Sequence, residues 1–261
     1  MLSYFLKELT NISLLYNRHF DGVIVSMHQS GSHWIKHILT ILFCRMYGID
    51  EPESINSFEI IGHPKVPPIH KNIPQIVHSH SIAHPLMSFK ATNDAFSLPK
   101  YLLLVRDIRS TLESHYARDK KFYGDTSFSD FLRGDKKGGK FHKDIWWDIR
   151  FLNSWSRVIK ADPGRVCVVR YEDLQADVAS EVEKICTFFE IEASRESIDY
   201  AINGSTKDKM NDKKGYGWVS IIRMNQVNVY EKYNDGDRTF IEQTLHKNLV
   251  DDFGYDYSKW D

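Results

Sequence analysis

The chain has 261 residues, of which 42% are hydrophobic and 26% charged, values typical of a globular protein rather than a disordered or fibrous one. Its 34 Lys and Arg balance 35 Asp and Glu, so no global field favours a nucleic acid or an acidic membrane as partner. No stretch rich in Pro, Gly or Ser divides the chain, and we expect one domain over residues 1–261.

The first 20 residues place apolar side chains at helical spacing but interrupt them with Lys7, Glu8, Thr10 and Asn11. This pattern predicts an amphipathic helix and lacks the continuous apolar core of a signal peptide. No apolar run approaches the roughly 18 residues that a membrane span needs. The three cysteines have no C-x-x-C spacing and lie in apolar contexts, as reduced core thiols do. We therefore predict a cytoplasmic protein without a membrane segment.

Four short apolar runs alternate with helical patterns along the chain. The runs do not alternate with polar residues as surface strands do, which favours a parallel sheet covered on both faces. The order of strands and helices predicts an α/β fold in which helices flank a central parallel β-sheet. The expected strands begin at Val23, Gln75, Tyr101 and Val166, and the expected helices cover 31–47, 107–119, 144–160, 177–189, 194–203 and 236–249.

Ligands of such folds bind beyond the carboxyl ends of the strands, so the residues after each strand form the candidate site. After the first strand, Gln29–Trp34 combines small and hydroxyl residues at the start of a helix. This loop can present backbone N–H groups and a helix N-terminus to an anion, although such a turn also serves as a plain helix cap. It is not the loop of nucleotide triphosphatases, because it has only Gly31 and no lysine before a hydroxyl residue.

The second strand is followed by His78 and His80, which project from the same face of an extended chain. One of them can act as a base, and the pair can alternatively be half of a zinc site, although cysteine or carboxylate ligands are missing nearby.

The third and fourth strands end in further candidates for nucleotide binding. Arg106 leaves the third strand and Ser114 follows eight residues later, a spacing that lets both reach one phosphate. Alternatively, Arg106 forms an ion pair with Asp107 or Glu113. The fourth strand ends at Tyr171, whose flat ring can pack against a base.

Together and in this order, these segments resemble the sulfotransferases that use 3′-phosphoadenosine 5′-phosphosulfate (PAPS). The family's P-K-S-G-T-T-W loop is similar to H-Q-S-G-S-H-W at His28–Trp34, and its K-T-H is similar to H-S-H at His78–His80. The family's arginine and serine for the 3′-phosphate fall on Arg106 and Ser114. Its Tyr-Glu-Asp segment is matched at Tyr171–Asp173.

The resemblance extends to the last third of the chain. The stretch from Ser205 looks like the family's flap, although it also fits an ordinary surface loop. The late R-K-G-x-x-G-x-W motif looks like residues 223–230, which places Arg223 on the arginine and Tyr230 on the tryptophan.

The resemblance implies a P-loop-like loop that holds the 5′-phosphosulfate, an adenine near Trp34 and Tyr171, and His80 as general base toward a hydroxyl or amine of a small-molecule acceptor. PAPS is the implied cofactor and adenosine 3′,5′-bisphosphate (PAP) its product. The implied cofactor-binding residues are Ser30, Gly31, Ser32, His33, Trp34, Arg106, Ser114, Tyr171, Thr206 and Arg223.

The chain departs from the family where cations are expected. Gln29 replaces the loop lysine, His78 replaces the lysine before the catalytic histidine, and Met224-Asn225 replaces the late lysine and glycine. Loss of one donor to the reacting group costs about 2.7–4 kcal/mol of barrier in other enzymes. Our hypothesis is that a protonated His78 compensates, so that His80, Gln29 and His78 form the catalytic group. No metal is implied.

Two alternatives stay open: a homologue that binds the nucleotide but has slow or no transfer, and another nucleotide-dependent phosphotransferase. The basic stretch 136–143 either closes over an acceptor or is solvated surface. The sequence indicates neither the acceptor nor the oligomeric state. An acceptor pocket, or alternatively the core, is expected to contain Trp146, Trp147, Tyr116, His84 and Phe89.

Overall fold

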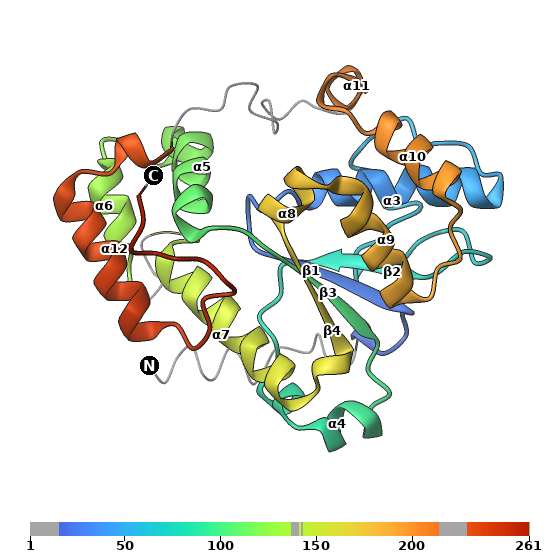
Figure 1. The fold of residues 1–261 in the computed structure, drawn as a ribbon, viewed down its shortest axis with the longest axis horizontal. Helices are drawn as coiled ribbons and strands as arrows, with labels where there is room; N and C mark the ends of the chain where they lie inside the picture. The colour runs from blue at the N-terminus through green and yellow to red at the C-terminus, as the bar shows by residue number, and fades with distance from the viewer. Residues whose placement is uncertain (1–15, 137–140, 142, 214–228, 261) are drawn as a thin grey trace.

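A four-stranded parallel sheet forms the centre of the computed structural model, which describes residues 16–136, 141, 143–213 and 229–260. The strand order is β2-β1-β3-β4 (Figure 1). This arrangement confirms the predicted α/β fold with its central parallel sheet. The strands are β1 (Gly22–Ser26), β2 (Ile76–Ser79), β3 (Lys100–Val105) and β4 (Val166–Arg170).

Helices cover both faces of this sheet (Figure 1). Their order follows the predicted alternation of strands and helices. The longer helices are α3 (Ser32–Tyr47), α5 (Ile108–Asp119), α7 (Ile145–Ala161), α9 (Val178–Phe189), α10 (Arg195–Gly204) and α12 (Asp235–Asn248). The shorter ones are η1 (Pro85–Ser88), α4 (Lys90–Ala95), η2 (Lys120–Phe122), α6 (Phe128–Arg133), η3 (Pro163–Arg165), α8 (Tyr171–Ala176), α11 (Lys207–Asp212) and η4 (Val229–Lys232).

The two sheet faces bury separate cores, as the alternation of side chains along a strand requires. Val23 and Val25 of β1 point into a core with α5, α6, α7 and α12, on the left of Figure 1. Ile24 points to the opposite face, against α3, α9 and α10 on the right. Because all four strands run parallel, their carboxyl ends lie at one edge of the sheet. The register pairs Val25 with Ser79 and Ser26 with Leu104.

The elements missed by the sequence pattern have six residues or fewer, too few to show a helical period; α4, α6, α8 and α11 have six each. The helix predicted in the first 20 residues lies mostly outside the described residues. No described helix combines the length and apolar character needed to cross a bilayer. The three cysteines are free thiols; Cys44 and Cys186 are buried and Cys167 is half-buried, as predicted.

Candidate functional site

The loop between β1 and α3 adopts two left-handed backbone conformations, at Gln29 (φ 61°) and Gly31 (φ 84°). Gly31 caps α3, and its carbonyl accepts hydrogen bonds from the amides of Trp34 and Ile35. The Ser30 hydroxyl donates to the Met27 carbonyl at 2.7 Å and closes the loop. The first amides of α3 therefore stay available to an anion, whereas the Ser30 hydroxyl proton is already committed within the loop.

Three predicted motifs meet at what we call the loop junction, formed by Gln29, Gly31, Arg106 and Tyr171. Arg106 Nη1 donates to the Gln29 carbonyl at 2.8 Å, and its guanidinium lies 4.5 Å from the centre of the Tyr171 ring. A Cβ added to Gly31 would lie 2.5 Å from Tyr171 Cδ2, so this ring excludes any side chain at position 31. The junction thus fastens the loop to the ends of β3 and β4.

The alternative ion pairs for Arg106 are not formed. Asp107 pairs with Arg109 at 2.6 Å, and Glu113 pairs with Lys232. Arg106 Nε is buried and has no hydrogen-bond partner among the described residues. A half-buried guanidinium with one buried, unused donor fits a site for a phosphate.

Further residues that the sequence predicts to bind the cofactor are Trp34, Ser114, Thr206 and Arg223. Trp34 Nε1 donates to the Ser205 carbonyl at 3.1 Å, which attaches the start of the predicted flap to α3. Thr206 follows as the N-cap of α11, and Ser114 is buried in α5. The structure records no hydrogen bond between Ser114 and Arg106. Arg223 lies outside the described residues.

His80 is held by the last residue of β1. Its Nδ1 lies 2.8 Å from the Ser26 carbonyl oxygen. Because a carbonyl only accepts, Nδ1 carries the proton and Nε2 carries the lone pair. Burial lowers the pKa of His80 to about 4, although the bond to Ser26 acts in the opposite direction. A neutral imidazole with a free Nε2 lone pair is the form that can accept a proton.

His78 lies beside His80, and its surroundings disfavour the predicted cation. Its Nε2 is 2.8 Å from the Ser26 hydroxyl, and its ring meets the His80 ring edge-on at 4.7 Å. Burial and the neighbouring His80 hold the pKa of His78 well below its ordinary value. The imidazole is therefore neutral near pH 7, and the structure gives no support to a protonated His78.

Two residues that the sequence did not single out complete the cluster. The His28 ring packs against the His80 ring at a tilt of 33° with centroids 3.8 Å apart, and Lys143 Nζ lies 3.0 Å from His28 Nδ1. We call His28, His78 and His80 the histidine cluster. The sequence offered one signal for each of these two residues. His28 occupies the position of the family's loop proline, and Lys143 belongs to the basic stretch 136–143.

Of the five residues expected near an acceptor, only Trp147 contacts the histidine cluster, with its ring 4.6 Å from that of His28. Trp146 donates to the Arg133 carbonyl, and Tyr116 packs among other aromatic rings. His84 caps η1 and Phe89 is exposed at the start of α4.

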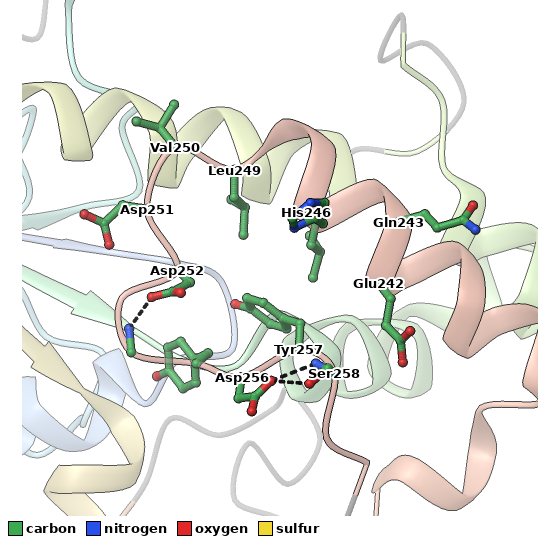
Figure 2. Close-up of a pocket in the computed structure, with 13 residues that line it drawn as sticks. Glu242, Gln243, His246, Leu249, Val250, Asp251, Asp252, Asp256, Tyr257 and Ser258 are labelled. Carbon is green, nitrogen blue, oxygen red and sulfur yellow. Dashed lines mark hydrogen bonds between the residues drawn. The ribbon is translucent and has the colours of Figure 1, made fainter.

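Neither a metal site nor the hollow beside α12 provides an alternative centre in the part of the chain that the structure describes. Among the described residues, no group of three or more His, Cys, Asp and Glu side chains is arranged to hold a metal ion. A hollow of about 920 Å³ lies between α12 and the segment that follows it (Figure 2). It contains none of the predicted site residues, and an anion would be repelled by the carboxylates that line it: Glu242, Asp251, Asp252 and Asp256.

Comparison with known proteins identifies the family. The family model described as "Sulfotransferase domain" matches residues 20–237, most of the chain. The chain belongs to the sulfotransferase family. This sulfotransferase is 25% identical over 266 residues to sulfotransferase 6B1 of Danio rerio, an alignment that covers 94% of this chain and 83% of that protein.

Solved structures show the same fold at low sequence identity. Mouse sulfotransferase SULT7A1 complexed with PAP aligns with a TM-score of 0.64 and 16% identity, covering 95% of this chain and 93% of that one. Retinol dehydratase in complex with androsterone and the inactive cofactor PAP aligns with a TM-score of 0.65 and 15% identity, covering 96% and 87%.

Proposed function

We propose that this sulfotransferase transfers the sulfuryl group of PAPS to a hydroxyl or amine of a small-molecule acceptor, with His80 as general base. The observation that carries the proposal is the bond from His80 Nδ1 to the Ser26 carbonyl, which leaves Nε2 as a proton acceptor. Ser26 is the last residue of β1, so His80 is fixed next to the start of the loop. Sulfuryl transfer requires a general base and a loop that binds an anion, and both lie at the end of β1.

The donor is proposed to lie across the loop junction. The free amides at the start of α3 would hold the 5′-phosphosulfate, and Arg106, with its unused buried Nε, would hold the 3′-phosphate. Tyr171 and Trp34 offer flat rings for the adenine. Two structural relatives are crystallised with PAP, which supports a donor of this class.

In the transfer step, His80 Nε2 takes the proton of the acceptor as its oxygen or nitrogen forms a bond to sulfur. The bond from sulfur to the bridging oxygen breaks, and the electron pair leaves with PAP. Gln29 can donate a hydrogen bond near the leaving group but brings no charge, and His78 is neutral. We therefore propose a turnover limited by weak stabilisation of the leaving group.

A small partly apolar acceptor is the proposed substrate class. One structural relative is crystallised with androsterone, and another solved complex contains retinol. In this chain, the ring of Trp147 beside the histidine cluster provides an apolar surface for such a molecule. The cytoplasmic location stays a prediction.

The second candidate, a nucleotide-binding homologue with little transfer, is favoured by the neutral side chains at Gln29 and His78. Both candidates predict that PAP binds in a calorimetric titration. Only the first predicts that labelled sulfate passes from PAPS to members of a panel of phenols, alcohols and amines, and that His80→Ala lowers the rate of this transfer by about a hundredfold or more.

The replacement Gln29→Lys sharpens the distinction. Restoring a cation in the loop is expected to increase the rate of a slow enzyme by about tenfold or more. Binding of ATP with magnesium, together with no binding of PAP, would contradict both candidates.

A further inference from the structure

Lys143, His28 and His80 form a continuous contact chain that ends on the backbone of β1. Lys143 Nζ lies 3.0 Å from His28 Nδ1, the His28 and His80 rings are 3.8 Å apart and tilted by 33°, and His80 Nδ1 lies 2.8 Å from the Ser26 carbonyl. Trp147 packs on His28 with ring centroids 4.6 Å apart. His28 is therefore fixed at one ring nitrogen and packed against two neighbouring rings.

The hydrogen-bond partners give the two stacked imidazoles opposite tautomers. Burial lowers the pKa of Lys143 to about 8, so at pH 7 it is an ammonium group that only donates. His28 Nδ1 must then accept, which places the ring proton of His28 on Nε2. His80 has the reverse arrangement, because its Nδ1 donates to a carbonyl.

We propose that Lys143 is a positioning residue for the general base: it fixes the tautomer and ring plane of His28, and the His28 ring holds His80 with Nε2 toward the acceptor. This inference rests on the proposed function of His80. It also answers what the chain offers in place of the family's lysines. In this chain, Lys143 acts through the imidazole of His28, whereas the family's lysines in the loop and before the histidine are expected to act on the reacting group.

The charges around the stack support this role. Lys143 forms no ion pair with a described residue, because Asp119 is engaged by Arg118. Its ammonium charge therefore acts on both imidazoles and lowers the pKa of each. The other ionisable groups that act on His28, His80 or Lys143 are His78 of β2, His33 and Lys36 of α3, His115, Arg118 and Asp119 of α5, and Asp148 of α7.

The direct test is nitrogen-15 NMR of histidine in the full-length protein, with and without PAP. Nitrogen shifts and couplings to ring protons distinguish a protonated from an unprotonated ring nitrogen. We expect the Nε2–H tautomer at His28 and the Nδ1–H tautomer at His80. An Nδ1–H tautomer at His28 in the wild-type protein would overturn the proposal. This measurement does not depend on activity, so it is independent of the proposed function.

Three variants separate the contact from the charge. Lys143→Met is expected to give mixed tautomers at His28 and to raise the titration midpoint of His80 by about 0.5. Lys143→Arg keeps a cationic donor and is expected to preserve the His28 tautomer. His28→Phe keeps a flat ring against His80 but removes the acceptor for Lys143.

Lys36→Met is the matched control, because Lys36 also lowers the pKa of His80 but has no recorded hydrogen bond to His28. It is expected to leave the His28 tautomer unchanged. An unchanged His28 tautomer in Lys143→Met, or an equal change in Lys36→Met, would refute the positioning role.

Transfer kinetics from PAPS to the best phenol of the panel provide the second readout. We expect kcat to fall about tenfold in Lys143→Met and in His28→Phe, and to recover in Lys143→Arg. The affinity for PAP should stay within about twofold, which verifies that each variant is folded. Equal kcat in all variants would overturn the inference, whereas absence of PAP binding in the wild-type protein would instead overturn the proposed function.

Discussion

The loop junction and the histidine cluster lie at the same edge of the sheet but depend on different properties of their residues. The loop junction depends on backbone: the Gln29 carbonyl receives Arg106, and the missing side chain of Gly31 makes room for Tyr171. The histidine cluster depends on the protonation of its side chains: His78 Nε2 faces the Ser26 hydroxyl, and His80 Nδ1 faces the Ser26 carbonyl. At Gly31, Arg106 and Tyr171 the chain keeps the family's residue types. At Gln29 and His78 it has replaced the family's lysines.

This difference matters because the two kinds of construction respond differently to substitution. A change at the loop junction alters shape and should affect nucleotide binding first. A change in the histidine cluster alters protonation and orientation and should affect transfer while binding is preserved.

The largest effect is expected from His80→Ala. Removal of a general base typically lowers the rate by about a hundredfold to ten-thousandfold. PAP affinity should be unchanged in the same variant, because His80 is not part of the loop junction. His246→Ala, which alters an exposed histidine of α12, is the matched control for both transfer and calorimetry. Loss of PAP binding in His80→Ala would show that the two regions are not separable.

Arg106→Met is expected to have the next largest effect, on binding. Charged hydrogen bonds are worth roughly 1.5–3 kcal/mol, so PAP affinity should fall roughly tenfold to a hundredfold. Adenosine 5′-monophosphate, which lacks the 3′-phosphate, should bind with a much smaller change. Equal losses for both nucleotides would mean that Arg106 only supports the Gln29 carbonyl.

Gly31→Ala tests the shape of the loop junction. The added Cβ meets the Tyr171 ring and also requires a left-handed alanine, a conformation that costs about 1–2 kcal/mol. We expect PAP affinity to fall about tenfold. Gly124→Ala is the control, because Gly124 also has a positive φ but has open space around it. It should lower the melting temperature slightly and leave PAP affinity intact.

The smallest effect concerns pH. A base with a pKa near 4 stays unprotonated down to about pH 5, so kcat/KM should change less than about twofold between pH 5.5 and 7. A histidine with its ordinary pKa near 6.5 would lose about tenfold over that range. A pH profile measured with saturating PAPS distinguishes the two, and an acid limb near pH 6.5 would contradict the buried neutral state.

The same depressed pKa has a consequence for stability. Above pH 6.5, His80 is neutral in both the folded and the unfolded chain. Between pH 6.5 and about 4, the unfolded chain takes up a proton that the folded chain does not, so the free energy of unfolding decreases as the pH falls. Urea denaturation at pH 7.5 and 5 measures this decrease.

The sequence by itself determined the sheet, the longer helices and the approximate place of the site. Continuous apolar runs specify buried parallel strands, and helical spacing over ten or more residues specifies a helix. The rule that ligands bind at strand ends then selected Gln29, His80, Arg106 and Tyr171. Gln29, Arg106 and Tyr171 meet at the loop junction.

Only the tertiary structure decided the partners and the protonation of these side chains. Lys143 and His28 are 115 residues apart, and no local pattern indicates that they touch. Arg106 does not pair with its neighbour Asp107, because that carboxylate pairs with Arg109. His78 carries no charge because burial removes the water that would stabilise it. Local sequence sets secondary structure through short-range sterics and periodicity, whereas hydrogen-bond partners and desolvation depend on what distant segments bring to the same place.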